Sequence, residues 1–483
     1  MKNSIKLLAL SAVVLFMSAC DKSLLDPKNS VFILEKEAYS TPARVQSQVI
    51  ALYDAAKSGA FLGSRMHPFS DIRGEEFLNR TQNAVTGLTT WNQSFFNGTN
   101  EVGYFWATGY AVINQCNTLI GKVQSKEVGD VLKSAPLQLQ YEAEARFIRA
   151  LSYSYLVRMY CRPFAESNGT SRGLPLRLGS EADLNNNDLA PSNVAAVYTQ
   201  ILADLNFAET NLPLTGSVTR AHRNTVIALK TRIYLAMQRW ADVITEANKI
   251  VPLVPPFRAA TGVAHALNAD PLLVFAPPYT TTESIFSFPF SDVDQPGTQN
   301  SMSLYWAAAP IGNGEYTINT TRNVGIAGDT ANFPVTDARR KMLTRIGTAV
   351  YLNGKFPTGP INTDFTPIMR YPEVLLNLAE ALTRNSSTVD VRAVALLNAV
   401  RGRADASVVF TVAGLTDATA LRNAILTERR IEFLGEGFRS FDITRNLLPF
   451  PAKSGAPTVA ATAVNYVYPI PSIELTLNKL MVP

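Results

Sequence analysis

The side chains best suited to acid–base or metal chemistry do not form a recognisable catalytic set. The histidines are His67, His222 and His265, and no HExxH motif contains any of them, so a zinc hydrolase would have no visible ligand set. Apart from Cys20, the cysteines are Cys116 and Cys161, and neither belongs to a CxxC motif or to a cluster with histidine. Their apolar helical surroundings predict small buried side chains rather than a disulfide or a catalytic thiol.

Two short motif matches lack the context that their chemistry requires. Residues 169–173 (GTSRG) fit the G-x-S-x-G pattern, but a nucleophile elbow needs a buried strand before it and a helix after it, and Leu174-Pro175 follows here. We therefore predict a surface turn. Asp183, Asn185 and Asn187 are spaced like calcium-loop ligands, but the glycine and terminal glutamate of an EF-hand are absent. We predict no cofactor and no metal site, and leave only a structural cation open.

Paired carboxylates are the remaining route to catalysis, because a glycosidase uses two of them. Glu75 and Glu76 are adjacent, and adjacent side chains are expected to point apart. Glu428, Glu432 and Glu436 recur at four-residue spacing among arginines, which favours ion pairs along a helix and keeps the acids ionised. We therefore predict that Glu428, Glu432 and Glu436 stabilise the fold and that the protein is not an enzyme.

Aromatic side chains in polar loops are better candidates for function. A sugar binds by stacking its C–H face on an aromatic ring while polar side chains bond its hydroxyl groups. Trp91 lies in the polar segment TTWNQ and is the best single candidate. Further aromatic residues lie among Pro, Thr, Asn and Gly after residue 254, and two or three are expected to line a shallow surface site. The predicted ligand-binding residues are Trp91, Asn92, Arg73, Arg80, Tyr279, Tyr305, Trp306 and Tyr316.

The N-terminal segment predicts export and lipid attachment. Two lysines, an apolar run of about 11 residues and two small residues precede Cys20, as in a bacterial signal peptide that ends at a lipidation cysteine. The run is well short of the roughly 20 residues that a membrane-spanning helix needs. We predict removal of residues 1–19, acylation of Cys20 and a tether over residues 20–36. An ordinary secretory signal beside an unrelated cysteine is the alternative.

Composition predicts a folded body and gives no reason to expect a nucleic-acid partner. The chain has 483 residues, of which 47% are hydrophobic and 17% charged, enough for a large core and unlike a disordered chain. Its formal net charge of +5 falls to +3 without residues 1–19, which contain two lysines and no acids. So small a charge does not indicate nucleic-acid binding.

Helical periodicity dominates the body. Residues 43–57, 105–123 and 137–160 carry apolar side chains at three- and four-residue intervals, as amphipathic helices do. Pro191 and Ser192 precede a further apolar stripe, and we expect Ser192 to be the N-cap of that helix.

Two segments predict helical hairpins, and the region between them differs from both. Residues 225–251 and 371–403 combine small alanines with a short turn, as in tetratricopeptide repeats. Between them the chain is rich in Pro, Gly, Asn, Thr and aromatic residues. The expected fold is mainly α: one body, residues 37–483, in which a tetratricopeptide-like helical-hairpin superhelix (about 37–253 and 368–446) carries a large irregular, loop-rich insertion (about 254–367) with few short strands.

Several segments carry a family resemblance. They are residues 370–382 (RYPEVLLNLAEAL), 396–404 (LLNAVRGRA), 425–445 (ILTERRIEFLGEGFRSFDITR) and 468–478 (YPIPSIELTLN), together with EARFIRALSYSYLVRMY and the spacing of Trp106, Tyr110, Ile113 and Asn117. This set resembles the SusD/RagB family of outer-membrane nutrient-binding lipoproteins. It spans nearly the whole mature chain.

The resemblance implies a location and a function. Such proteins lie on the surface of Bacteroidetes-type bacteria as the lid of a SusC-like TonB-dependent transporter, and they capture glycans or, in the RagB-like branch, peptides for import. We therefore expect a surface-exposed, lipid-anchored outer-membrane protein that binds an oligomeric nutrient, glycan before peptide. A surface-anchored glycan hydrolase is one alternative. A scaffold that binds a protein partner and no nutrient is another.

Overall fold

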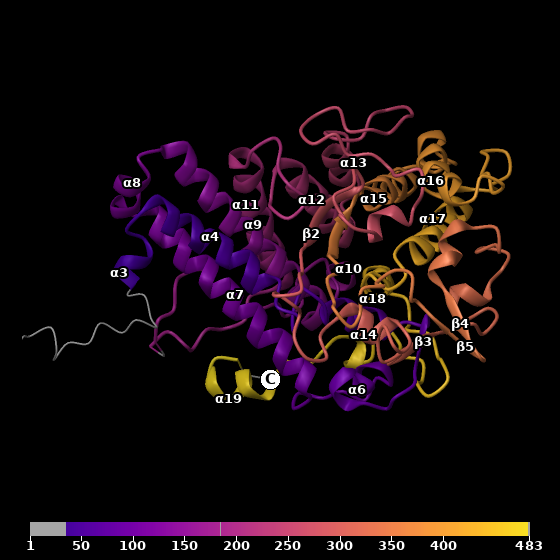
Figure 1. Ribbon diagram of the computed structural model, residues 1–483, viewed down its shortest axis with the longest axis horizontal. Coiled ribbons are helices and arrows are strands. Elements are labelled where there is room, and N and C mark those ends of the chain that lie inside the picture. Colours follow the sequence, from indigo (N-terminus) through magenta and orange to yellow (C-terminus); the bar gives the residue numbers. More distant parts are fainter. Residues whose placement is uncertain (1–34, 184, 482–483) are drawn as a thin grey trace, which may run out of the picture.

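The computed structural model describes residues 35–183 and 185–481. The predicted signal peptide, Cys20 and nearly all of the predicted tether lie outside these residues. Helices make up most of the regular structure and succeed one another along an elongated molecule, from α4 and α7 at one end to α16 and α17 at the other (Figure 1). None of the described helices is long and apolar enough to span a bilayer.

The first half of the body is built on long helices that pack side by side. Helix α9 (Ala135–Tyr160) packs against α4 (Pro42–Ala56), α7 (Asn100–Gln124) and α11 (Val194–Asn211). The predicted helices over 43–57, 105–123 and 137–160 are confirmed. The shorter helices of this half are α3 (Glu35–Ala38), α5 (Met66–Asp71), α6 (Leu88–Trp91), α8 (Lys126–Leu132) and α10 (Phe164–Ser167).

The prediction that Ser192 caps α11 is wrong by one residue. The Asn193 side chain accepts a hydrogen bond from the Ala196 N–H (2.7 Å), which satisfies one of the free amides at the helix start. The Ser192 hydroxyl instead donates to the Leu174 carbonyl (2.7 Å). Serine and asparagine both cap helices well. Because the Ser192 hydroxyl is used in the bond to Leu174, Asn193 is the residue that caps the helix.

Two helical hairpins continue the superhelix. Helix α12 (Arg223–Ala236) turns back through α13 (Trp240–Ala247), and α15 (Tyr371–Arg384) turns back through α16 (Val391–Ala404). Helix α15 packs against both helices of the first hairpin and against α17 (Ala418–Glu432). The predicted mainly α, tetratricopeptide-like fold is confirmed. Helices α18 (Arg439–Arg445) and α19 (Ser472–Leu477) follow.

The segment between the hairpins contains short strands and long loops. In the described chain, β1 (Phe77–Asn79) pairs with β3 (Tyr316–Ile318), β2 (Ser284–Phe288) with β6 (Thr366–Arg370), and β4 (Thr344–Ile346) with β5 (Ala349–Tyr351), each antiparallel. The β1–β3 pair joins the start of the body to the insertion. Short helix α14 (Met302–Trp306) also lies here.

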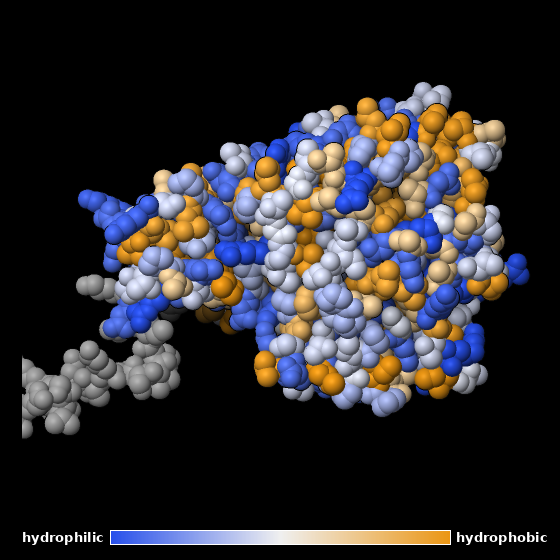
Figure 2. All heavy atoms as spheres, turned by 45° about the horizontal axis from the view of Figure 1, so that its top comes forward, coloured by the Kyte–Doolittle hydropathy of each residue, from blue (hydrophilic) through white to orange (hydrophobic). Residues whose placement is uncertain are grey.

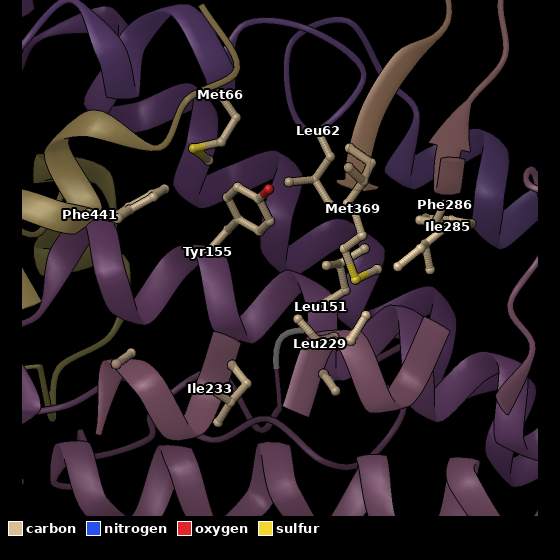
Figure 3. Close-up of a cluster of buried hydrophobic side chains, with 14 of the residues drawn as sticks. Leu62, Met66, Leu151, Tyr155, Leu229, Ile233, Ile285, Phe286, Met369 and Phe441 are labelled. Carbon is tan, nitrogen blue, oxygen red and sulfur yellow. The ribbon is translucent and has the colours of Figure 1, made fainter. Parts of the chain in front are cut away.

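The core joins the superhelix to this insertion. Leu151 and Tyr155 of α9 and Leu229 and Ile233 of α12 lie in one cluster with Phe286 and with other side chains of β2, β6 and α18 (Figure 3). Burying a large apolar side chain contributes about 1.5–3 kcal/mol, and this cluster draws its members from both halves of the chain. The strands β2 and β6 are therefore fixed against the helices.

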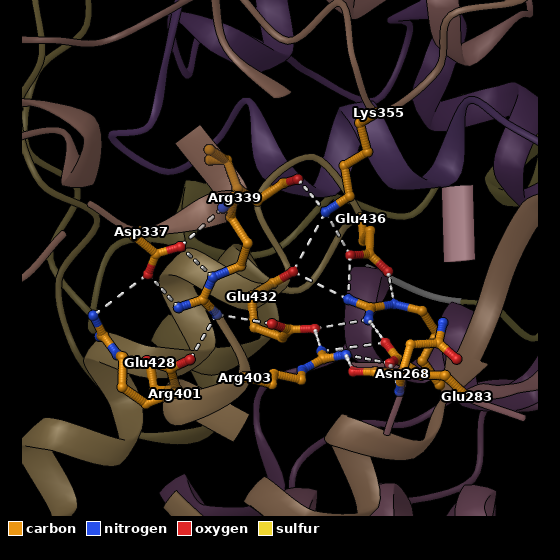
Figure 4. Close-up of polar contacts among 12 residues, drawn as sticks. Asn268, Glu283, Asp337, Arg339, Lys355, Arg401, Arg403, Glu428, Glu432 and Glu436 are labelled. Atoms are coloured by element: carbon orange, nitrogen blue, oxygen red, sulfur yellow. Dashed lines mark hydrogen bonds and ion pairs between the residues drawn. The ribbon is translucent and has the colours of Figure 1, made fainter. Parts of the chain in front are cut away.

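In addition to the apolar cluster, a buried network of ion pairs holds the insertion against the helices. It contains the cations Arg339, Lys355, Arg370, Arg401 and Arg403 and the anions Glu283, Asp337, Glu428, Glu432 and Glu436 (Figure 4). Although burial alone would raise it, the arginines hold the pKa of Glu432 well below its ordinary value. The glutamates of α17 therefore bind arginines of α16 and of the insertion, and the prediction that they stabilise the fold agrees with these contacts.

Candidate functional site

An open cleft of about 450 Å³ lies where the β1–β3 pair, the β4–β5 hairpin and α6 meet. From the first half of the chain it is lined by Leu78, Asn79, Arg80, Gln82, Leu88 and Trp91. From the insertion and the C-terminal segment it is lined by Thr317, Ile318, Thr320, Thr348, Ala349, Val350, Ser454 and Gly455. Two predicted ligand-binding residues, Arg80 and Trp91, are brought together here. We call this site the Arg80–Trp91 cleft.

Most of the polar side chains at the rim of the cleft have no partner among residues 35–183 and 185–481. The side chains of Arg80, Gln82, Thr320, Thr348 and Ser454 are exposed and form no hydrogen bond or ion pair with any described residue. The backbone around them is held independently, since the Arg80 N–H donates to the Glu315 carbonyl (2.9 Å). Free donors and acceptors on a held backbone are what a polar ligand requires.

Trp91 lies at the base of the cleft and offers only part of its ring. Its indole N–H donates to the Phe77 carbonyl (2.9 Å), and 8% of the residue is exposed. Gly455 covers the six-membered ring so closely that a Cβ there would lie 2.5 Å from Cη2 of Trp91. The Lys453 ammonium lies 5.4 Å from the centre of a Trp91 ring. Trp91 thus supplies a strip of apolar surface and not an open stacking platform.

Arg73 and Asn92 do not line the cleft. The Arg73 guanidinium is buried 4.3 Å from the centre of the Phe450 ring and donates to the Asn465 carbonyl (2.8 Å). Burial lowers the pKa of Arg73 to about 10. The Asn92 Oδ1 accepts from the backbone N–H of Ser94 (3.1 Å) and from its hydroxyl (2.6 Å), so it shapes the turn after α6. In this conformation Arg73 is a structural residue, and its prediction as a ligand contact is corrected.

Three of the four aromatic residues predicted in the insertion belong to the core. Trp306 stacks on Phe77 with 4.1 Å between ring centres and donates to the Gly435 carbonyl (3.2 Å). The hydroxyls of Tyr305 and Tyr316 donate to backbone carbonyls at 3.1 and 2.9 Å. All three side chains are fully or almost fully buried. The prediction that they face a ligand is therefore wrong: their rings lie in the core, where Trp306 packs against Phe77 of β1.

Tyr279 also lies away from the cleft. Its ring stacks on Phe365 with 4.8 Å between centres, and its hydroxyl donates to Asp364 (3.3 Å). The residue is 6% exposed. It therefore packs the loop that leads into β6.

Phe96 and Tyr104 were not predicted, although they are the exposed aromatic residues of the described chain. They are 62% and 49% exposed, before and at the start of α7. Phe96 occurs in the polar segment SFFNGT, so the reasoning that singled out Trp91 applied equally there. Neither lines the Arg80–Trp91 cleft. Elsewhere on the surface, apolar residues are dispersed among polar ones on the face shown in Figure 2.

A second, shallower groove of about 580 Å³ lies between α7, α19 and the loop that joins α10 to α11. Its polar groups already bond one another. The Trp106 indole N–H donates to Glu474 (3.1 Å), the Asn114 amide donates to the Glu181 carbonyl (2.9 Å), and Arg177 donates to the Glu181 carboxylate (2.6 Å). These bonds hold the walls of the groove together, so we prefer the first cleft as the candidate site.

The groups considered for catalysis are buried in structural contacts. Contrary to our expectation, Glu75 and Glu76 do not point apart: both bind the Arg430 guanidinium, at 3.0 and 2.7 Å. Against the effect of burial, Arg439 and Arg430 lower the pKa of Glu75, whereas burial raises the pKa of Glu76. Neither carboxylate lines the cleft, and the shared arginine links them to α17.

The histidines and cysteines are equally enclosed. His67 bonds the carbonyls of Glu436 and Leu62 at 3.0 Å, and the His222 side chain caps α12 by accepting the Thr225 N–H (3.1 Å). Cys116 and Cys161 are buried free thiols, as predicted, and burial raises the pKa of each.

The two motif matches contain no catalytic arrangement in the described residues. The Ser171 hydroxyl lies 2.7 Å from that of Ser167, within a turn that Gly169 forms with a φ of +80°. Asp183 accepts hydrogen bonds from the backbone and side chain of Asn185, both at 2.9 Å. Among residues 35–183 and 185–481, no three His, Cys, Asp or Glu side chains are grouped to hold a metal ion.

Comparison with known proteins identifies the family. The pattern of the SusD family matches residues 290–466, and that of a family described as "Starch-binding associating with outer membrane" matches residues 25–235. A SusD superfamily protein from Bacteroides fragilis, known from its crystal structure, is 30% identical with a TM-score of 0.81; the match covers 92% of this chain and 99% of that one.

Two further relatives agree. A SusD-like protein from Bacteroides ovatus is 22% identical over an alignment of 481 positions, gaps included, which covers 89% of this chain and 80% of the relative. A laminarin-binding SusD-like protein of solved structure is 22% identical with a TM-score of 0.69, and the match covers 92% and 99% of the two chains. A tetratricopeptide-like superhelix with a loop-built insertion is thus the class of fold. The chain belongs to the SusD/RagB family.

Proposed function

We propose that this protein binds an oligomeric nutrient in the Arg80–Trp91 cleft and delivers it to a SusC-like TonB-dependent transporter. A glycan is the preferred ligand and a peptide the alternative. The proposal depends chiefly on one observation: the cleft carries hydroxyl, amide and guanidinium side chains that bond nothing else in the described chain. The SusD-like relative that binds laminarin supports a glycan as the ligand.

The chemistry of the cleft suits a sugar. A sugar ring has hydroxyl groups at its edge and C–H bonds on its faces, so it needs polar and apolar contacts close together. Gln82, Thr320 and Thr348 can supply the polar contacts. The apolar contacts come from Leu78, Val350 and the exposed strip of Trp91. The volume of about 450 Å³ falls within the roughly 300–1,000 Å³ of ordinary ligand sites, and the cleft is open to solvent, so a longer chain can continue beyond it.

The binding experiment uses the mature protein and calorimetry with a panel of soluble glycans and peptides. In the variant Gln82→Ala/Thr348→Val, two free hydrogen-bonding side chains are removed without disturbing the core. At about 0.5–1.5 kcal/mol for each bond, affinity should fall roughly 5- to 150-fold. Gln115→Ala/Thr199→Val makes the same changes at exposed positions outside the cleft and should leave affinity unchanged. Equal affinity of the two variants would exclude the cleft as the site.

Delivery to a transporter requires that the protein stay beside it. Cys20 is our proposed lipid attachment point, and residues 20–36 are the proposed tether, which would raise the local concentration of the partner at the outer membrane. Cys20→Ala should abolish uptake in cells and spare ligand binding in solution. A transporter-sized β-barrel should copurify with the lipidated protein. Normal import by the Cys20→Ala strain would contradict the role of the anchor.

We also propose that the protein is a binding protein and not a hydrolase. Incubation of the purified protein with each bound glycan should release no new reducing ends. Release that is lost in a Glu75→Gln/Glu76→Gln variant would favour the hydrolase. Copurification with a β-barrel in the absence of any glycan or peptide binding would favour a protein-binding scaffold.

A further inference from the structure

The charge of the Arg80–Trp91 cleft points to a narrower class of ligand. Among the described residues that line it, Arg80 is the charged one, and no carboxylate accompanies it. The Arg80 side chain is exposed and forms no ion pair within residues 35–183 and 185–481. The nearest acid along the strand pair, Glu315, is buried and accepts hydrogen bonds from the hydroxyls of Thr81 and Thr86, so it is not the partner of Arg80.

Two further arginines lie on the segments that bound the cleft. Arg322 follows the lining residue Thr320 by two positions, and Arg345 is the direct cross-strand partner of Val350 in the β4–β5 hairpin. Directly paired residues of antiparallel strands project from the same face, so Arg345 shares a face with Val350. Both arginines are exposed and form no ion pair in the described part of the chain. Arg80 is thus the arginine that lines the cleft, and two further unpaired arginines lie on segments that contribute lining residues.

We propose that the cleft selects glycans with an anionic substituent, a uronate carboxylate or a sulfate ester, and that Arg80 binds this substituent. The inference rests on the proposed glycan-binding function. A guanidinium forms two parallel charge-assisted hydrogen bonds with a carboxylate or sulfate, roughly twice as strong as bonds between neutral groups. A neutral sugar would exclude water from the Arg80 guanidinium and would offer it only hydroxyl groups as hydrogen-bond partners. The uncharged remainder of the lining fits the sugar ring itself.

The test uses matched probes at 150 mM salt. The methyl ester of oligogalacturonate lacks the carboxylate charge and adds only a methyl group, and desulfated carrageenan oligosaccharides lack only the sulfate. Two further comparisons extend the panel to other sugars: alginate is a second uronate polymer, and xylan is used both with and without its glucuronate substituents. We expect at least one anionic member to bind tenfold or more tightly than its neutral counterpart, and its affinity to fall as salt is raised. Which arm responds identifies carboxylate or sulfate as the substituent.

Variants assign the preference to Arg80. Arg80→Gln should reduce the anionic preference to within about twofold, and Arg80→Lys should retain part of it, because an ammonium is a point charge without the planar fork. Arg258→Gln is the matched control: Arg258 is exposed, lies outside the cleft and forms no ion pair with a described residue. It should keep the full preference. Unchanged thermal unfolding of each variant verifies the fold.

The possible failures are distinguishable. A neutral glycan that binds as tightly as its anionic counterpart, loses affinity in Gln82→Ala/Thr348→Val and ignores Arg80→Gln would overturn this inference and leave the proposed function in place. An anionic preference that survives Arg80→Gln, or that Arg258→Gln weakens equally, would overturn it as non-specific attraction. Failure of every glycan to bind would overturn this inference, and failure of every glycan and every peptide to bind would overturn the proposed function as well.

Discussion

Replacement of Arg370 by methionine tests the role of the buried ion network. Arg370 ends β6 and is 2% exposed. It donates to Glu436 (2.7 and 2.8 Å), to Glu283 (2.6 Å) and to Glu432 (2.7 Å). Arg370→Met retains much of the length of the side chain but removes its charge. Three buried carboxylates then lose a cation that all of them contact. Lys355 and Arg403 remain beside them and compensate only part of their charge.

The size of the effect follows from the burial of these groups. Removal of one partner from a buried ion pair costs about 3–5 kcal/mol, because a charge stays in the interior without compensation. The entropy of unfolding is about 2.1 cal/mol/K per residue, or roughly 0.9 kcal/mol/K for the roughly 450 described residues. The midpoint of thermal unfolding should therefore fall by about 3–5 °C.

The assay is calorimetric unfolding of the mature protein at pH 7. Arg239→Met is the matched control, because Arg239 forms an exposed ion pair with Asp242 (2.7 Å) on α13. Such a surface pair contributes about 1 kcal/mol or less, so the midpoint should move by about 1 °C at most. If Arg370→Met shifts the midpoint no further than Arg239→Met, the network does not stabilise the fold as argued.

Three further outcomes are expected. Trp306→Ala should lower the free energy of unfolding by about 3–5 kcal/mol in urea denaturation, because Trp306 fills the core; a midpoint equal to that of the wild type would contradict its burial. Burial, with the neighbouring His222, lowers the pKa of His265 from 6.5 to about 4, so the unfolded state binds the extra proton and stability declines as pH falls from about 6.5 to 4. Against the wild type, His265→Gln should reduce this decline by up to about 1.4 kcal/mol per pH unit, and an unchanged slope would refute the assignment. Cys116 and Cys161 should react with a thiol reagent only after denaturation, and two rapidly titrating thiols in the native protein would disprove their enclosure.

The helices could be predicted because their signals are local. Apolar residues at three- and four-residue spacing located α9 within a few residues of its observed bounds, and the alanine-rich segments located both hairpins. The start of α11 was missed by one residue because a tertiary contact, the bond from Ser192 to Leu174, occupies the predicted cap. Local signals thus identify an element and tertiary contacts adjust its end.

The site could be predicted only in part. The polar segment around Trp91 predicts a ligand-binding residue, and Arg80 is predicted as a polar partner; both line the cleft. The same rule failed for Trp306 and Tyr316, because Trp306 stacks on Phe77 of β1 and the Tyr316 hydroxyl donates to the Thr86 carbonyl, so that both rings are buried. Polar neighbours in the sequence do not report what covers a side chain in space. Phe96, which is exposed, also lies in a polar segment, although it is not among the predicted ligand-binding residues.

The sequence by itself determined the predicted export signal, the mainly α superhelix and the family, because each is written in consecutive residues or in short repeated spacings. Only the tertiary structure decided which polar groups remain free. The Arg80–Trp91 cleft forms because β1 pairs with β3 across more than two hundred residues and Gly455 closes over Trp91. Pairing over such distances depends on the whole core. No local pattern could therefore show that the Arg80 side chain has no partner among the described residues while Arg370 is surrounded by carboxylates.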